Sequence, residues 1–185
     1  FHPLYIELKK NFVSGDLGEL LGIHTNYYGG WIHSGIHLVD IVRFIFSEEF
    51  GDLAVVETIA DGRETDPTFT VRSSFGSKGI PIWFYGWNEK HYQLFDLEFR
   101  FSEGRVRINN FEQDIAWDQF YINSMGERVL SRQNKDLPNC TVSPMSSAVD
   151  MIATHLDTTN INLLKGLLVS DIAPSMQTLW RVQFK

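Results

Sequence analysis

The chain has 185 residues and a formal net charge of −7, with 16 Lys and Arg against 23 Asp and Glu. This charge excludes a nucleic-acid partner, because binding a phosphate backbone requires clustered Lys and Arg, which here are scattered. Hydrophobic residues make up 43% of the chain, enough for one core, but no apolar run approaches the roughly 18 to 20 residues of a membrane span. The single cysteine, Cys140, excludes an intrachain disulfide and is typical of a cytoplasmic protein.

The first part of the chain predicts a helix, a strand and a second helix. Pro3 suits the first turn of a helix that ends at Gly15. Alternating side chains over 19–28 predict a strand, which leads into Gly29. The stretch 28–46 has the periodicity of a helix that is buried on several sides and keeps one polar stripe.

The remainder of the chain predicts a sheet followed by two helices. From Leu53 onward the hydrophobic period becomes two, with expected strands joined by short Gly-bearing turns at 68–75, 80–87, 94–101, 106–108, 115–121 and 127–132. Helices are expected over 143–155 and 170–182. Because strands and helices do not alternate, this order predicts an α+β domain with a large, mostly antiparallel open sheet and helices packed on one face.

One face of the predicted sheet carries large aromatic residues among charges. Trp83, Tyr85 and Trp87 lie on the same side of one strand, a composition typical of an interface. The alternative is that these rings are covered by loops or by the terminal helix. The pattern leaves both interpretations open.

Polar residues fit for chemistry recur inside the apolar helical stretch. His33, His37 and Asp40 have the spacing i, i+4 and i+7, which places them on one helical face. A histidine there could transfer protons, and the three residues together could bind Zn or a similar ion. As a third alternative, the histidines could be structural, with hydrogen bonds to the backbone or to Asp40.

The same stretch resembles the C-terminal, substrate-binding domain of the Gfo/Idh/MocA family of NAD(P)-dependent oxidoreductases. From Gly29 to Asp40 it reads Gly-Gly-Trp-Ile-His-Ser-Gly-Ile-His-Leu-Val-Asp, against the family pattern Gly-x-x-x-Asp-x-Gly-x-His-x-x-Asp. Segments 1–9 and 14–19 are similar to the part of the family's sequence just after its catalytic Lys motif. The resemblance implies that residues 1–185 form a single C-terminal substrate-binding domain.

The resemblance also implies an activity and a set of roles. In this family an N-terminal Rossmann domain binds NAD or NADP, and hydride passes between a sugar or polyol carbon and the nicotinamide. His37 occupies the position of the family's catalytic His and is implied to be the acid/base. The other implied roles are a catalytic helper or substrate hydrogen-bonding partner for His33, substrate contacts for Tyr28 and Trp31, and structural roles for Gly30, Gly35 and Asp40, with Asp40 pairing with Arg43.

Two features depart from the family pattern. His33 stands where many members have an acidic residue, four places before the catalytic His. Neither a Gly-x-Gly-x-x-Gly fingerprint nor Glu-Lys-Pro is present. We therefore expect the Rossmann domain to lie outside this chain, the chain alone to bind no cofactor, and activity to require the complete oxidoreductase.

The leading hypothesis is thus the substrate-binding and oligomerisation half of a cytoplasmic NAD(P)-dependent sugar or polyol dehydrogenase or reductase. Its expected partners are a small sugar or polyol, the Rossmann domain, and further copies of the chain in a homodimer or tetramer formed through the sheet face. A non-catalytic metal- or sugar-binding domain that uses His33, His37 and Asp40 is the alternative. A pure interaction domain is a third possibility.

Overall fold

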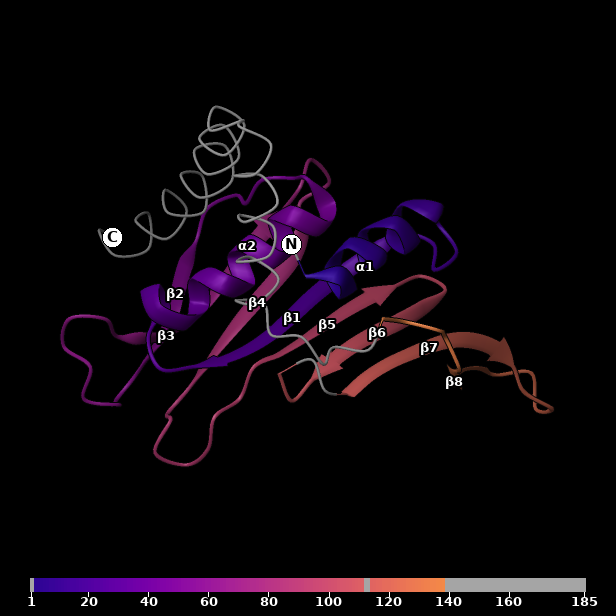
Figure 1. The fold of residues 1–185 in the computed structure, drawn as a ribbon. Helices are drawn as coiled ribbons and strands as arrows, with labels where there is room; N and C mark the ends of the chain where they lie inside the picture. The colour runs from indigo at the N-terminus through magenta and orange to yellow at the C-terminus, as the bar shows by residue number, and fades with distance from the viewer. Residues whose placement is uncertain (1, 112–113, 139–185) are drawn as a thin grey trace, which may run out of the picture.

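A computed structural model describes residues 2–111 and 114–138, which form one sheet with two helices on one face (Figure 1). The helices are α1 (Pro3–Ser14) and α2 (Ile36–Phe46). The strands are β1 (Leu20–Tyr28), β2 (Ala54–Ile59), β3 (Thr68–Phe75), β4 (Ile80–Trp87), β5 (Asp96–Phe101), β6 (Gly104–Asn109), β7 (Asp114–Ile122) and β8 (Arg128–Gln133). The helices predicted at 143–155 and 170–182 lie outside the described residues.

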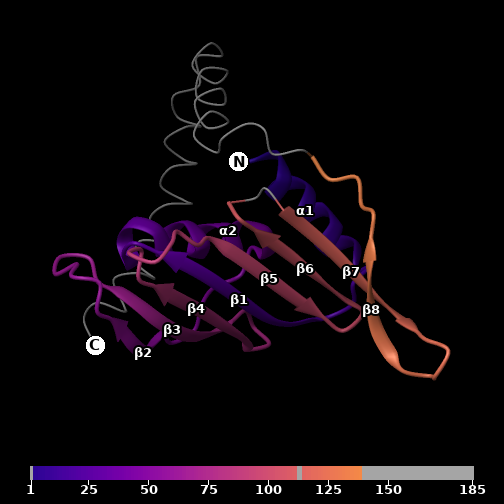
Figure 2. The same ribbon diagram turned by 90° about the horizontal axis from the view of Figure 1, so that it is seen from below.

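The sheet has eight strands in the order β2-β3-β4-β1-β5-β6-β7-β8 (Figure 2). All neighbouring strands are antiparallel except β1 and β4, which run parallel. The predicted α+β class and the mostly antiparallel open sheet are confirmed. The first strand in the chain is central in the sheet, where it directs the chain straight into the segment that precedes α2.

The first helix begins and ends as its sequence predicts, whereas the helix predicted over 28–46 starts later, because β1 extends to Tyr28 and a π-helical turn over 31–35 precedes α2. Pro3 is in the first turn of α1, and Gly15 ends that helix in the left-handed conformation with a φ of 82°. Lys9 ties the two helices together, because its Nζ donates to the Phe44 carbonyl and to Ser47 Oγ, each at 2.8 Å, at the end of α2. Neither helix of the described segments has the length and apolar character needed to cross a membrane.

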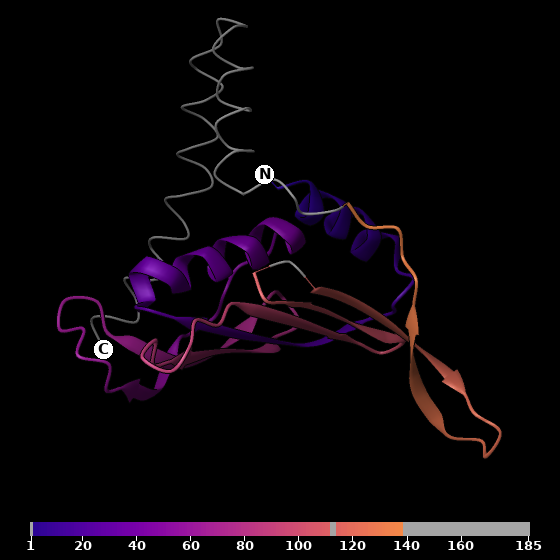
Figure 3. The same ribbon diagram turned by 60° about the horizontal axis from the view of Figure 1, so that its bottom comes forward.

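The core lies between the helices and the face of the sheet that they cover (Figure 3). Alternate residues of every central strand point into it, among them Ile23, Phe84 and Phe99, all fully buried. Burying one such side chain contributes about 1.5 to 3 kcal/mol. The opposite face of the sheet, which we call the open face, carries no helix in the described part of the chain.

Candidate active site

The start of the helix that bears the histidines is held by the loop between β2 and β3. We call the continuous helical segment 31–46 the histidine helix; it consists of a π-helical turn over 31–35 followed by α2. Each backbone N–H from residue 30 to residue 33 donates to the loop or to the first residue of β3. The acceptors are Thr68 Oγ1 for Gly30 (2.8 Å), the Pro67 carbonyl for Trp31 (3.1 Å), Asp66 Oδ1 for Ile32 (2.7 Å) and Asp66 Oδ2 for His33 (2.9 Å).

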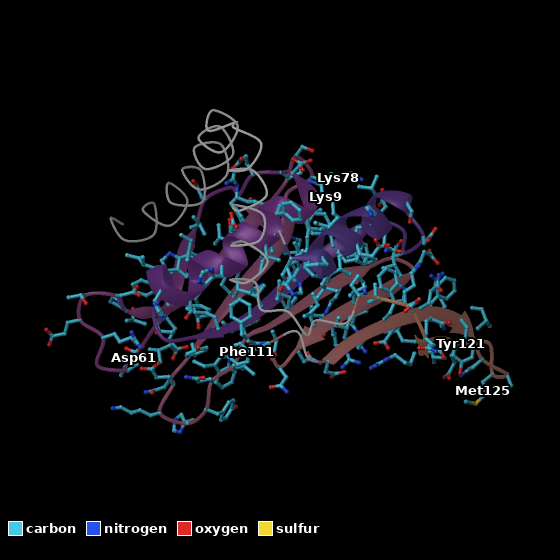
Figure 4. The ribbon with its side chains drawn as sticks, in the orientation of Figure 1. Lys9, Asp61, Lys78, Phe111, Tyr121 and Met125 are labelled. Atoms are coloured by element: carbon cyan, nitrogen blue, oxygen red, sulfur yellow. The ribbon has the colours of Figure 1, made fainter. Side chains whose placement is uncertain are left out.

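These contacts satisfy donors that have no partner within a helix, because the first N–H groups of any helix lack an acceptor in the preceding turn. Residues at both ends of this loop make further hydrogen bonds. The Thr68 hydroxyl donates to Asp61 Oδ2, and the Tyr27 hydroxyl donates to the Phe69 carbonyl at 2.6 Å. Figure 4 shows Asp61 at the end of the sheet where β1 ends and the histidine helix begins.

Trp31 is a core residue rather than a surface residue. It is completely buried, with its ring centroid 5.7 Å from that of Tyr27 and 5.4 Å from that of Phe84. A Cβ at Gly35 would lie 2.5 Å from Trp31 Cε3, so glycine is what allows the indole to pack against the turn. The substrate contact predicted for Trp31 does not fit this structure, because none of its side chain reaches the surface.

His33, His37 and Asp40 form the polar stripe that their spacing predicted. All three are exposed, whereas Leu38 and Val42 on the other side of the helix are buried against the core. Desolvation lowers the pKa of His37; the Asp40 carboxylate opposes this effect, and the charge of His33 lowers the pKa further. The His37 imidazole is therefore mostly neutral at pH 7 and able to accept a proton.

Tyr28 lies on a different side of β1 from the histidine helix. Successive residues of a strand point to opposite faces. Tyr27 points to the face that the helices cover, where it contacts Trp31. The ring of Tyr28 makes an edge-to-face contact with Phe111, with centroids 5.9 Å apart. The structure thus brings His33 and His37 together, but it places Tyr28 and Trp31 elsewhere.

The described residues offer no set of ligands for the predicted metal site. Across residues 2–111 and 114–138, no three His, Cys, Asp or Glu side chains gather closely enough to hold a metal ion.

Arg43, which the sequence predicted as a partner of Asp40, makes an ion pair with Glu49 at 2.6 Å.

The open face combines the predicted aromatic residues with a network of charges. Trp83 and Tyr85 stack with ring centroids 5.6 Å apart and an interplanar angle of 6°, and Trp87 Nε1 donates to Asn26 Oδ1 at 3.0 Å. A hollow of about 220 Å³ lies beside them, lined by residues that include His24, Tyr85, Asp96, Glu98 and Arg100.

Farther along the open face, Asp118 sits at the centre of an arginine cluster. Its carboxylate accepts hydrogen bonds from Arg105 at 3.0 Å, Arg132 at 2.9 Å and Arg107 at 3.2 Å. Burial alone would raise the pKa of Asp118, but the hydrogen bonds from Arg132 and Arg105 and the charge of Arg107 hold it below its usual value.

Sequence reasoning missed the loop residues that hold the histidine helix. Asp66-Pro67-Thr68 carries a local signal, because Asp before Pro is typical of a turn. That signal cannot say which helix the carboxylate will reach, since Asp66 and His33 are far apart in the chain. The π-helical turn was missed as well, because it depends on packing around Trp31.

Comparisons with known proteins agree with this architecture. No family model and no curated protein sequence matches the chain. Among solved structures, it is similar to KijD10, a 3-ketoreductase from Actinomadura kijaniata in complex with NADP, with 13% identity, a TM-score of 0.62, and coverage of 96% of this chain and 55% of that one. It is also similar to an aldose-aldose oxidoreductase from Caulobacter crescentus, with 15% identity, a TM-score of 0.61, and coverage of 85% and 51%.

A further similar structure is a super-repressor mutant of Gal80p from Saccharomyces cerevisiae, with 13% identity, a TM-score of 0.58, and coverage of 88% of this chain and 50% of that one. The chain shares its fold with Gfo/Idh/MocA-type proteins. It spans about half the length of the structures it matches. The fold predicted from the resemblance is therefore confirmed.

Proposed function

We propose that this chain is the substrate-binding and oligomerisation half of an NAD(P)-dependent sugar or polyol oxidoreductase. His37 is its catalytic acid/base, and His33 is a helper or a hydrogen-bonding partner of the substrate. The observation that carries the proposal is the exposed side chain of His37 on a helix whose start is held by four hydrogen bonds to the β2–β3 loop and the first residue of β3. Desolvation also lowers the pKa of His37. The shared fold supports it.

The chemistry of alcohol oxidation requires such a group. A bound nicotinamide would accept the hydride from the carbinol carbon of the sugar. As the C–H bond breaks, the hydroxyl must lose its proton, and the neutral His37 imidazole is suited to receive it. In the reduction direction the protonated imidazole returns that proton to the forming hydroxyl. His33 and Asp40 then tune the proton affinity of His37.

The remaining parts of the proposal concern partners. A Rossmann domain preceding this segment would bind NAD or NADP, and the similar structure of KijD10 is a complex with NADP. A homodimer or tetramer would form through the open face, where Trp83, Tyr85 and Trp87 lie. The complete oxidoreductase would work in the cytoplasm.

The test is steady-state kinetics of the full-length protein with His37→Ala. We expect kcat to fall by about 10² to 10⁴, the usual contribution of a general acid or base, and His33→Ala to have a smaller effect. The matched control is His24→Ala, because His24 lines the hollow of the open face, on the side of the sheet that the histidine helix does not cover. Turnover by His37→Ala at the rate of the unmodified protein would contradict the proposed role.

A non-catalytic role is the second candidate, and the fold allows it because Gal80p, described as a repressor, shares it. In that case His33, His37 and Asp40 would bind a sugar without turnover. Steady-state turnover and sugar binding of the full-length protein separate the two candidates. Sugar binding that is weakened on changing either histidine, in a full-length protein that shows no turnover, would support the non-catalytic function.

A further inference from the structure

The loop that holds the histidine helix also determines which chemical groups this end of the site can accept. Asp66 places one carboxylate oxygen 2.7 Å from the Ile32 nitrogen and the other 2.9 Å from the His33 nitrogen. The N–H groups at the start of a helix are otherwise a ready place for a phosphate or a carboxylate, because they point outward and carry the positive end of the helix dipole. Here a side chain of the protein already occupies them.

The neighbouring donors are occupied as well. Gly30 N–H donates to Thr68 Oγ1, and Trp31 N–H donates to the Pro67 carbonyl. The loop therefore uses all four N–H groups from residue 30 to residue 33, and a bound anion would find no free backbone donor among them.

The surrounding charges are mainly negative. Arg63 is a residue of this loop, and it forms an ion pair with Glu89 at 2.7 Å. The carboxylates of Glu89, Asp61 and Asp66 all act on the Arg63 guanidinium, so its single positive charge is outnumbered. An anionic substrate group would meet net repulsion here.

The arrangement is built into the backbone. A Cβ on residue 30 would lie 2.2 Å from Asp66 Oδ2 and 2.9 Å from the Asp66 carbonyl oxygen, so only glycine lets the loop approach this closely. His37 lies four residues beyond His33, about 6 Å along the helix at 1.5 Å per residue. A substrate that contacts either histidine is therefore close to Asp66.

We propose that Asp66 is a positioning and specificity-determining residue of the candidate site. It fixes the first turn of the histidine helix and, by filling the Ile32 and His33 donors with its own carboxylate, restricts the site to uncharged sugars or polyols and rejects phosphorylated or carboxylated ones. This inference rests on the proposed function in one respect, namely that a sugar binds beside His37.

The test asks whether removing the carboxylate opens an anion site. The amide signals of Ile32 and His33 in the ¹⁵N-labelled chain are followed by NMR as inorganic phosphate is added. In the unmodified chain we expect no saturable shift at these two amides. In Asp66→Ala both donors are free, and we expect a saturable shift with an affinity for phosphate at least about tenfold above that of the unmodified chain.

Glu64→Ala is the matched control, because it removes an exposed carboxylate from the same loop without touching the helix. It should behave like the unmodified chain, so that a general change in net charge does not explain the result. A gain of phosphate binding also separates Asp66 from a merely structural cap, whose loss would weaken the helix without creating a ligand site.

A second variant keeps the inference testable if Asp66→Ala does not fold. Asp66→Asn retains one oxygen acceptor but loses the negative charge and turns an NH₂ group toward one of the donors, so at least one N–H is released. Phosphate binding at Ile32 or His33 is expected there too. A folded variant that gains no phosphate binding, or an unmodified chain that binds phosphate equally well at these amides, would overturn the inference.

The outcome is independent of the test of the proposed function. Phosphate titration of the two amides uses neither turnover nor a sugar, whereas the role of His37 is decided by kinetics of the full-length protein. Failure of His37→Ala to reduce turnover would remove the catalytic role of His37 and leave the phosphate result to judge Asp66 alone.

Discussion

Gly30 and Asp66 approach each other so closely that a Cβ on residue 30 would lie 2.2 Å from Asp66 Oδ2. The contact joins the turn after β1 to the loop before β3. Gly30 also has a φ of 100°, a backbone conformation that other residues rarely adopt. This one position therefore combines a conformational and a steric requirement for glycine.

Gly30→Ala should destabilise the fold by about 2 to 4 kcal/mol, the sum of backbone strain and weakened hydrogen bonds from Asp66. Urea unfolding of the chain measures the change. Gly62→Ala is the matched control, because Gly62 has a φ of 78° but nothing within 4 Å of the added Cβ, and strain alone costs about 1 to 2 kcal/mol. Equal losses in the two variants would show that the contact with Asp66 contributes nothing.

Gly35→Ala should destabilise the fold through Trp31. Gly35 has helical dihedral angles, so alanine at an open helical position would stabilise the chain by about 1 kcal/mol. Because the new Cβ would lie 2.5 Å from Trp31 Cε3, we expect instead a loss of about 1 to 3 kcal/mol, typical of overpacking. Urea unfolding measures it.

The double-mutant cycle with Trp31→Leu tests the cause. In the Trp31→Leu background the indole is absent, so Gly35→Ala should cost little or become favourable. An unchanged cost in that background would assign the effect to the helix itself rather than to the indole.

Local patterns in the sequence predicted the elements well and their pairing poorly. The predicted strands 68–75 and 80–87 coincide with β3 and β4, because side-chain alternation and Gly-bearing turns are local signals. The insertion of β1 between β4 and β5 was not predictable in this way. Its register, such as His24 opposite Trp83, joins residues that are distant in the chain.

The candidate site likewise combines a feature that local spacing predicts with features that depend on distant residues. The stripe of His33 and His37 follows from helical spacing alone. The hydrogen bond that Asp66 accepts from the His33 N–H depends on a tertiary contact. The burial of Trp31 follows from its packing against Tyr27 and Phe84. Such contacts leave no periodic trace in the sequence.

The proton affinity of His37 should respond to its two charged neighbours in opposite directions. His33→Ala removes a positive charge and should raise the pKa of His37, whereas Asp40→Asn removes a negative charge and should lower it. Titration of the imidazole signals by NMR measures both changes. Shifts in the same direction in the two variants would contradict the electrostatic description.

The lowered pKa of His37 also makes stability depend on pH. Its folded-state pKa lies below the unfolded value of about 6.5, so the unfolded chain binds more protons in the window between the two. The free energy of unfolding should therefore rise with pH through that window and level off above it. His37→Gln should reduce this dependence, leaving the part due to His24, whose pKa is also lowered by burial.

The open face should mediate self-association. Trp83 stacks on Tyr85 at its surface, and Arg72 lies beside it in register on β3. Trp83→Lys would replace an apolar ring with a second cation there, so the dissociation constant of the oligomer should rise at least about tenfold. Sedimentation velocity at several concentrations measures it, with Tyr92→Lys, at an exposed tyrosine of the β4–β5 loop, as the control. Because Tyr92 lies outside the open face, that variant should associate like the unmodified chain. An unmodified chain that stays monomeric at every concentration would contradict the role of the open face as an oligomer interface.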